Sequence, residues 1–138
     1  MKKILLSVVV LMVLTGCGKK NDDPETLPEI RLTDVSVTEG TGTNEAVAIK
    51  VSLSKTYSAQ VSVNWSTTEG TAKGGDDYIA INSQVLNFAP GETEKTIAVT
   101  VVRDDIREGD EFFTIQFSKP MNALLLGDKL RVTLTNDD

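Results

Sequence analysis

The segment that decides the fold runs from residue 94 to residue 111, EKTIAVTVVRDDIREGDE, and it changes character halfway. Its first half alternates polar and apolar residues, with Ile97, Val99 and Val101 on one side, which is typical of a β-strand with one buried face. Its second half places five carboxylates within the eight positions 104–111. Like charges this close repel one another, so the loop predicts either a solvated acidic turn or a cation-binding site.

The same period-two alternation recurs from Ile30 onward, with turn residues between the runs and no helical stripe. We expect strands at residues 30–38, with a kink, and at 45–54, 59–68, 84–88, 94–102, 112–118 and 129–136. This pattern predicts an all-β fold, a seven-stranded antiparallel Greek-key β-sandwich of the immunoglobulin type. Trp65 is predicted to lie in the core, and Tyr78 is predicted to pack at a corner of the sandwich. The apolar run 121–126 is expected to pack over a sandwich edge, with an interaction patch as the alternative.

The N-terminus has the features of an export leader. Residues 1–16 begin with Lys2 and Lys3 and continue with an apolar run, and Leu14-Thr15-Gly16-Cys17 resembles a bacterial lipobox, at which the leader is removed and Cys17 is acylated. Residues 17–29 are polar and predict a flexible tether, followed by one domain at residues 30–138. We expect an extracytoplasmic lipoprotein anchored in the outer membrane. The Lys-Lys-Asn-Asp-Asp run after Cys17 is similar to surface-export signals and suggests exposure on the cell surface.

Charge and composition argue against several functions. Without Lys2 and Lys3 the chain has 12 basic and 20 acidic residues, which disfavours nucleic acid and anionic membrane surfaces as partners. The chain has no histidine and no recognisable catalytic triad, so we do not expect an enzyme. A glycosidase-like use of paired carboxylates would need aromatic platforms, and aromatic residues make up 5% of the chain.

The acidic residues are predicted to gather at one end of the sandwich. If the strands alternate in direction, the loops after the first, third, fifth and seventh share one pole. Those loops hold 11 of the 20 acidic residues, namely Glu39, Glu69, Asp76, Asp77, Asp104, Asp105, Glu108, Asp110, Glu111, Asp137 and Asp138. Such a convergence favours a divalent cation. Calcium suits an all-oxygen donor set better than zinc, which prefers His and Cys, or magnesium, which requires a more rigid octahedron.

Four motifs, taken together and in this order, resemble the Calx-beta domain. They are Val37-Thr38-Glu39-Gly40, Gly70-Thr71-Ala72-Lys73-Gly74-Gly75-Asp76-Asp77-Tyr78, Phe88-Ala89-Pro90-Gly91-Glu92-Thr93 and Asp104-Asp105-Ile106-Arg107-Glu108-Gly109-Asp110-Glu111-Phe112. The resemblance covers about residues 38–138 and implies a calcium-binding sandwich. The ligands that it implies are Glu39, Asp77, Asp104, Asp105, the main-chain carbonyl of Ile106, Glu108, Glu111, Asp137 and Asp138.

The sequence also departs from the strong calcium binders of that family. Arg103 stands where the acidic run often begins with another Asp, and Asn136 precedes the final acids. A guanidinium at that position could replace one cation and form salt bridges with Asp104 or Glu108. We therefore expect one or two weakly held Ca²⁺ ions, with none as the alternative.

Two functional hypotheses follow. In the first, the chain is a lipid-anchored extracytoplasmic calcium-binding module, whose Ca²⁺ rigidifies an interaction surface at the acidic pole. In the second, it is a metal-independent structural or adhesion domain on the cell surface. In both, a protein or glycan of unknown identity is the partner.

Overall fold

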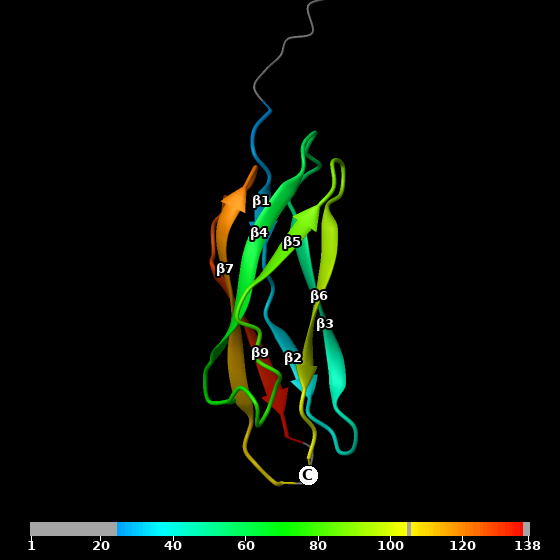
Figure 1. The fold of residues 1–138 in the computed structure, drawn as a ribbon, viewed down its shortest axis with the longest axis vertical. Coiled ribbons are helices and arrows are strands. Elements are labelled where there is room, and N and C mark those ends of the chain that lie inside the picture. The colour runs from blue at the N-terminus through cyan, green and yellow to red at the C-terminus, as the bar shows by residue number, and fades with distance from the viewer. Residues whose placement is uncertain (1–24, 105, 137–138) are drawn as a thin grey trace, which may run out of the picture.

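The structure is a computed structural model that describes residues 25–104 and 106–136, and these residues form β-strands without any α-helix (Figure 1). The strands are β1 (Glu29–Arg31), β2 (Val35–Thr38), β3 (Glu45–Leu53), β4 (Val61–Glu69), β5 (Gln84–Phe88), β6 (Glu94–Val101), β7 (Glu111–Met121), β8 (Leu124–Leu125) and β9 (Lys129–Thr135). They form two sheets, one in the order β6-β3-β1-β8 and the other in the order β2-β9-β7-β4-β5. The sheets face each other, which confirms the expected immunoglobulin-like β-sandwich.

The strand count and the pairing differ from the expectation in two places. The expected first strand divides at residues 32–34, so that β1 pairs with β3 in one sheet and β2 pairs with β9 in the other. The run 121–126 contains β8, which pairs with β1 and extends the first sheet. The described chain therefore has nine strands rather than seven, and the β1–β8 and β2–β9 pairs are parallel rather than antiparallel.

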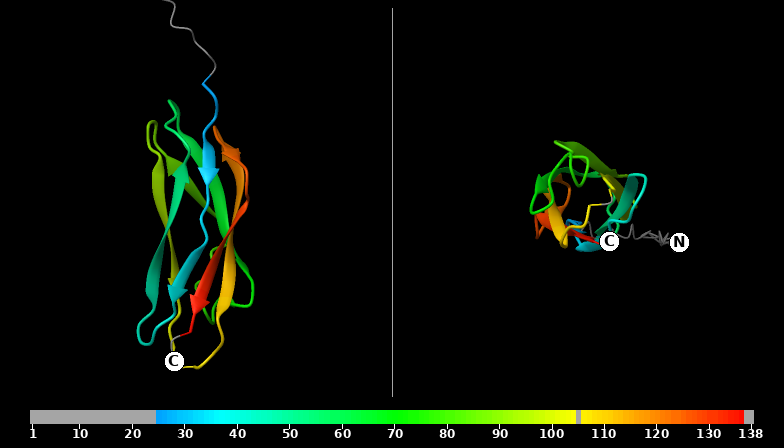
Figure 2. Two further views of the ribbon diagram at one scale, coloured as in Figure 1. Left: turned by 180° about the vertical axis from the view of Figure 1, so that it is seen from behind. Right: turned by 90° about the horizontal axis from the view of Figure 1, so that it is seen from below.

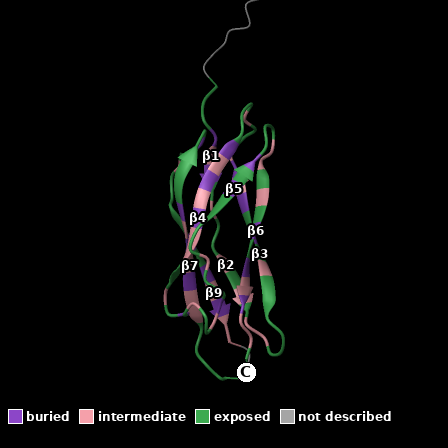
Figure 3. Ribbon diagram, in the orientation of Figure 1, coloured by how far each residue is buried: buried purple, intermediate pink, exposed green. Residues whose placement is uncertain are grey.

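The core consists of the alternate residues that the two sheets direct toward each other (Figure 3). On β3, for example, Ile49 and Val51 are fully buried while Lys50 between them is exposed. Trp65 is 6% exposed, as predicted for the core, and Tyr78 is 1% exposed. The Tyr78 ring stacks on Phe113 with the ring centroids 4.0 Å apart. Burial of these apolar surfaces stabilises the fold by roughly 25 cal/mol per Å² removed from water.

The loops sort to two ends of an elongated sandwich (Figures 1 and 2). The loops at residues 39–44, 70–83 and 102–110 gather at the end where β9 finishes. The described chain enters the sandwich at the opposite end. We call these ends the acidic pole and the tether pole. None of the described segments forms a helix with the length and apolar character needed to span a bilayer.

The loop at residues 70–83 is held against β7 by close backbone packing. Ala72 donates its N–H to the Phe112 carbonyl at 3.0 Å, and Phe112 donates its N–H to Thr71 Oγ1 at 2.9 Å. A Cβ atom added at Gly70 would lie 2.7 Å from Phe112 Cδ2 and closer still to the Phe112 carbonyl oxygen. Glycine is therefore required here by space.

We expect Gly70→Ala to destabilise the domain by about 1–3 kcal/mol, because the loop must move away from β7 to make room. Thermal unfolding measures this change. Gly127→Ala is the matched control, since a Cβ at Gly127 meets nothing within 4 Å. Equal loss of stability in both variants would contradict the packing described here.

Candidate metal centre

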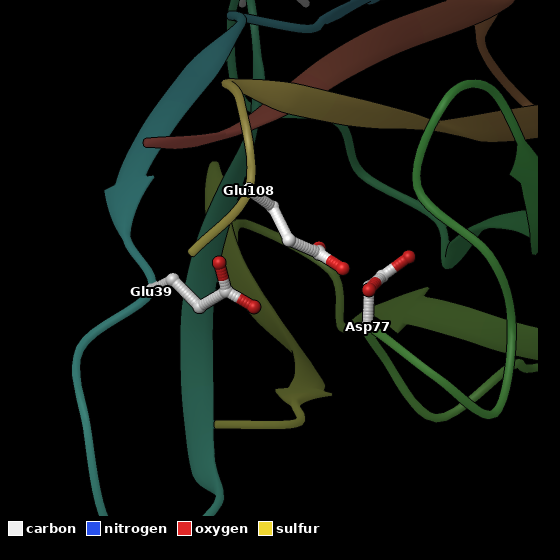
Figure 4. A group of neighbouring side chains, drawn as sticks. All are labelled: Glu39, Asp77 and Glu108. Carbon is white, nitrogen blue, oxygen red and sulfur yellow. The ribbon is translucent and has the colours of Figure 1, made fainter. Parts of the chain in front are cut away.

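Three carboxylates from three separate loops meet at the acidic pole (Figure 4). Glu39 directly follows β2, Asp77 lies in the 70–83 loop, and Glu108 lies in the 102–110 loop. One carboxylate oxygen from each lies within 4.8 Å of the other two. Figure 4 shows the three side chains directed toward a common space. Glu39 and Asp77 are half-buried, and Glu108 is exposed.

Backbone hydrogen bonds hold the first two carboxylates in place. Glu39 donates its N–H to the Thr135 carbonyl at 3.0 Å, which extends the β2–β9 ladder by one residue. The Asp77 carbonyl accepts the N–H of Val102 at 2.9 Å, so that the 70–83 loop is attached to the end of β6. Within the loop, Lys73 donates its N–H to Asp77 Oδ2 at 2.5 Å. Both carboxylates therefore lie at positions that the sheets determine.

The 102–110 loop is organised by side chains that bind its backbone. Ile106 donates its N–H to Asp104 Oδ1 at 2.8 Å, which is an Asx-type turn. Asn136 donates its N–H to Asp110 Oδ1 at 3.3 Å, and its Nδ2 lies 3.5 Å from the Ile106 carbonyl. The loop is therefore connected to the end of β9 at two points.

Burial and mutual repulsion raise the pKa of two carboxyl groups. The pKa of Glu39 lies above its usual value of 4.5 chiefly because the group is partly buried, and then because of the negative charges of Glu108, Asp104, Asp77 and Glu111. Burial also raises the pKa of Glu111, followed by the charge of Asp77 and a hydrogen bond with it. A cation at this pole would relieve the repulsion among these charges.

The structure groups the predicted ligands unequally. It brings Glu39, Asp77 and Glu108 together, and it places Asp104 and Glu111 near enough to raise the pKa of Glu39. The carbonyl oxygen of Ile106, which was predicted to be a metal ligand, instead lies next to the Asn136 side-chain amide. Asp105, Asp137, Asp138 and the predicted lipidation residue Cys17 lie outside the described residues. The contacts of Asn136 with the 102–110 loop were not predicted, because they depend on the tertiary arrangement of distant segments. The Lys73 N–H that Asp77 accepts lies four residues away in the same loop, and it was not predicted because alternation says nothing of how a loop folds back.

Arg103 takes a different position from the one expected. Within the described chain its ion pair is with Glu45, rather than with Asp104 or Glu108, and its backbone N–H lies 3.2 Å from Asn44 Oδ1. The guanidinium lies against Gly40, where an added Cβ would be 3.3 Å from Arg103 Cζ. The cause is register: β3 and β6 pair Glu45 with Val101, which places Glu45 beside the residues that follow β6.

The chain belongs to the Calx-beta domain family, whose match extends over residues 21–138. It is 45% identical over 58 residues to sodium/calcium exchanger 1 of Rattus norvegicus, an alignment that covers 42% of this chain and 6% of the exchanger. It is 32% identical over 77 residues to sodium/calcium exchanger Calx of Drosophila melanogaster, covering 56% of this chain and 8% of that protein. The chain therefore spans a small part of the length of these relatives.

Solved structures agree with this assignment. The apo-form Calx CBD1 domain superposes with a TM-score of 0.71 at 26% identity, covering 82% of this chain and 100% of that one. The calcium binding domain CBD12 of CALX1.1 superposes with a TM-score of 0.67 at 29% identity, covering 76% of this chain and 43% of that one. The cluster at the acidic pole offers carboxylate oxygens alone, which are the ligands that hard divalent cations such as Ca²⁺ take.

The raised pKa values predict how stability without metal depends on pH. In the unfolded chain Glu39 and Glu111 titrate near 4.5, and in the folded domain they titrate at higher pH. The folded state therefore binds more protons in this range, and stability without metal falls as the pH rises through the raised pKa values. The pKa of Glu92 is lowered by Lys95 and by the Ala89 N–H, so Glu92 changes stability with pH in the opposite direction. The effect of Glu39 is therefore measured by comparing a variant with the unaltered protein.

We expect Glu39→Gln to raise the melting temperature in EDTA at pH 7 and to change it little at pH 4.5. Thermal unfolding between pH 4.5 and 7.5 measures this difference, with the exposed Asp76→Asn as the control in the same part of the fold. A parallel pH dependence for Glu39→Gln and the unaltered protein would show that Glu39 is not destabilised by its neighbours.

Proposed function

We propose that the chain is a calcium-binding module, in which Glu39, Asp77 and Glu108 hold Ca²⁺ at the acidic pole. The observation that carries the proposal is that these three carboxylates come from three loops and meet within 4.8 Å. The exchangers to which the chain is similar carry calcium in their names, and CBD12 of CALX1.1 is described as a calcium binding domain. Asp104, Asp105, Glu111, Asp137 and Asp138 are the remaining candidates for one or two ions.

The chemistry of the cluster favours calcium among the common divalent cations. Ca²⁺ takes six to eight oxygen ligands in flexible geometry, which suits carboxylates on separate loops. Zn²⁺ prefers nitrogen and sulfur ligands, and the cluster contains neither. The cluster is assigned to binding rather than to catalysis, because its three carboxylates converge on one space as cation ligands do, and the chain has no histidine.

Bound calcium would neutralise the electrostatic repulsion among the three carboxylates, which the loops must otherwise hold together. With the ion bound, the residue that follows β2, the 70–83 loop and the 102–110 loop are all attached to one ion, so their relative motion decreases. The result is a more rigid surface at the acidic pole, which could then present a partner with a defined shape. Weak binding is expected, since extracellular calcium modules commonly have dissociation constants of about 10⁻⁴–10⁻³ M.

We expect millimolar Ca²⁺, but not Mg²⁺, to raise the melting temperature relative to EDTA. A ligand that binds the native state stabilises it by RT ln(1 + [L]/Kd), so a concentration ten times Kd contributes about 1.4 kcal/mol, or several degrees for a domain of this size. Asp77→Asn and Glu108→Gln should abolish the rise. The neighbouring Asp76→Asn should retain it, since Asp76 is outside the cluster. Identical melting in all three solutions would favour the metal-independent structural or adhesion role.

We also propose that the module is anchored by lipid on Cys17 outside the cytoplasm, in the outer membrane. The leader and the Leu-Thr-Gly-Cys sequence support this proposal. The arrangement of the fold is compatible with it, because the described chain begins at the tether pole and the carboxylate cluster lies at the other end (Figure 1). The calcium site would then point away from the membrane, toward a partner.

Cys17→Ala is expected to move the protein from the membrane fraction to the soluble fraction and to abolish incorporation of labelled fatty acid. Cell fractionation with metabolic labelling measures both effects. Ser7→Ala, a change within the leader that spares the lipobox, is the control. Persistent membrane association and labelling of Cys17→Ala would contradict the anchor.

A further inference from the structure

The crossing of the chain between the sheets leaves a large part of β3 with a neighbour on one side only. β1 pairs with β3 only at Ile30↔Leu53 and Arg31↔Ser52, and the chain then leaves for the other sheet. On its opposite side, β3 pairs with β6 from residue 45 to residue 52. Among the described residues, the part of β3 that precedes Ser52 therefore has no second neighbouring strand. Figure 2 shows β2 and β3 running beside each other without belonging to one sheet.

The direction of the backbone groups follows from the hydrogen bonds at the strand ends. Ser54 donates its N–H to the Glu29 carbonyl, on the β1 side, whereas Leu53 donates to the Thr93 carbonyl, on the β6 side. Because successive residues of a strand point to opposite sides, the N–H and C=O groups of Ala46, Ala48 and Lys50 point to the side that β1 has left.

β2 offers a second open edge that faces the first. Glu39 donates its N–H to the Thr135 carbonyl, so the odd-numbered residues of β2 bond to β9. The N–H and C=O groups of Ser36 and Thr38 therefore point away from β9, toward β3. Among the described residues, no strand pairs with this side of β2, and none pairs with this side of β3 before Ser52. We call the space between these two edges the β2–β3 seam.

The seam also exposes side chains that face the core. Val35, Val37 and Val47 are directed inward but remain half-buried, whereas Ile49 and Val51 further along β3 are fully buried. A surface depression lies over the same place, and it is lined by Thr33 and Val35 on one side and by Ala48, Lys50 and Ser52 with Glu94 on the other. The seam is therefore a groove with a mixed polar and apolar lining and an open sheet edge along each side.

We propose that the β2–β3 seam binds an extended segment of a partner polypeptide, which enters as an additional strand. Its backbone would pair with Ala46, Ala48 and Lys50, and its inward side chains would cover Val35, Val37 and Val47. A single extended segment can pair with both edges at once, whereas the edge strand of a folded sheet is already paired on one side and can pair with only one of them. We therefore take an extended segment, and not a second copy of the folded domain, as the occupant.

Charge indicates which segments are suitable. Along the seam, Glu45 pairs with Arg103 and Glu94 pairs with Lys50. Asp34, which precedes β2, adds one exposed negative charge, whereas Glu39 belongs to the carboxylate cluster of the acidic pole. The small side chains of Ala46 and Ala48 leave the outward face of the edge open. The favoured partner segment is therefore alternately apolar, about five residues long where it pairs with residues 46–50, and neutral or basic rather than acidic.

The probe for this proposal is an end-blocked peptide with the sequence Lys95–Val101, KTIAVTV. It alternates apolar residues, carries one positive charge and already pairs with β3 on the other side in the fold. Nuclear magnetic resonance of the ¹⁵N-labelled protein follows its binding. Before peptide is added, the amides of Ala46, Ala48 and Lys50 should exchange with solvent much faster than those of Val47, Ile49 and Val51. Saturation with peptide should slow their exchange by at least about tenfold, as for other amides that gain a strand partner.

Ala48→Pro tests the site directly. Proline removes an N–H that is used in no ladder of the fold, so the domain should remain folded, but binding of the peptide should weaken by at least about tenfold. Ala98→Pro is the matched control, because Ala98 pairs with Ala48 and its N–H points to the opposite edge of the sheet. A peptide N-methylated at alternate residues tests the same contact without altering the protein.

The proposal is supported if the three amides become protected and if binding is lost with Ala48→Pro and with the N-methylated peptide but retained with Ala98→Pro. Protection of these amides before peptide is added would show that the edge is already closed. Absence of binding at millimolar peptide, or equal binding by both proline variants, would overturn the proposal. Calcium is kept constant throughout, so these outcomes are independent of the metal site.

Discussion

Repulsion among the carboxylates of the acidic pole is the interaction on which the organisation of this end of the molecule depends. One carboxylate oxygen each of Glu39, Asp77 and Glu108 lies within 4.8 Å of the other two, and partial burial, followed by the surrounding negative charges, raises the pKa of Glu39. Such a group is unfavourable unless the scaffold holds it or a cation neutralises it. The scaffold contribution is visible in the bonds Glu39–Thr135, Asp77–Val102 and Asn136–Asp110, each of which connects a loop to the end of a strand or to the residue that follows it.

The same loops connect the metal site to the rest of the fold. Glu39 begins the 39–44 loop, which joins β2 to β3 and therefore closes one end of the seam between them. Arg103 packs on Gly40 in this loop and pairs with Glu45 where β3 begins. A guanidinium that was expected among the carboxylates instead holds the loop beside them. The Arg103 guanidinium thus pairs with Glu45 and not with a carboxylate of the Glu39, Asp77 and Glu108 cluster.

The sequence predicts those parts of the structure that depend on local pattern. Alternation in 45–54 and 94–102 identified β3 and β6. The single tryptophan, Trp65, is in the core as expected, and Tyr78 is packed in the sandwich. Alternation cannot predict which sheet a strand joins, and for this reason the division of residues 30–38 into β1 and β2 was missed. The two-residue β8 is too short to show a period at all.

The candidate metal site also has a part that the sequence predicted and a part that depends on tertiary arrangement. Strand direction alone predicted that Glu39, Asp77 and Glu108 would share a pole, because each follows a strand that ends there. The partner of Arg103 could not be predicted, since it depends on the β3–β6 register and not on sequence distance. The Asn136 contacts likewise join residues that are 26 and 30 positions apart. The contacts that could not be predicted from the sequence are therefore those that depend on the pairing of residues far apart in the chain.

The most direct measurement of the central claim is a calcium titration of the ¹⁵N-labelled protein followed by nuclear magnetic resonance. A calcium site at the acidic pole predicts saturable shifts confined to residues 38–44, 70–78 and 102–111 and to the end of β9, with the tether pole unchanged. The same titration with Mg²⁺ should give smaller shifts. Shifts spread evenly over exposed carboxylates at both poles, or no shifts at millimolar Ca²⁺, would contradict the assignment.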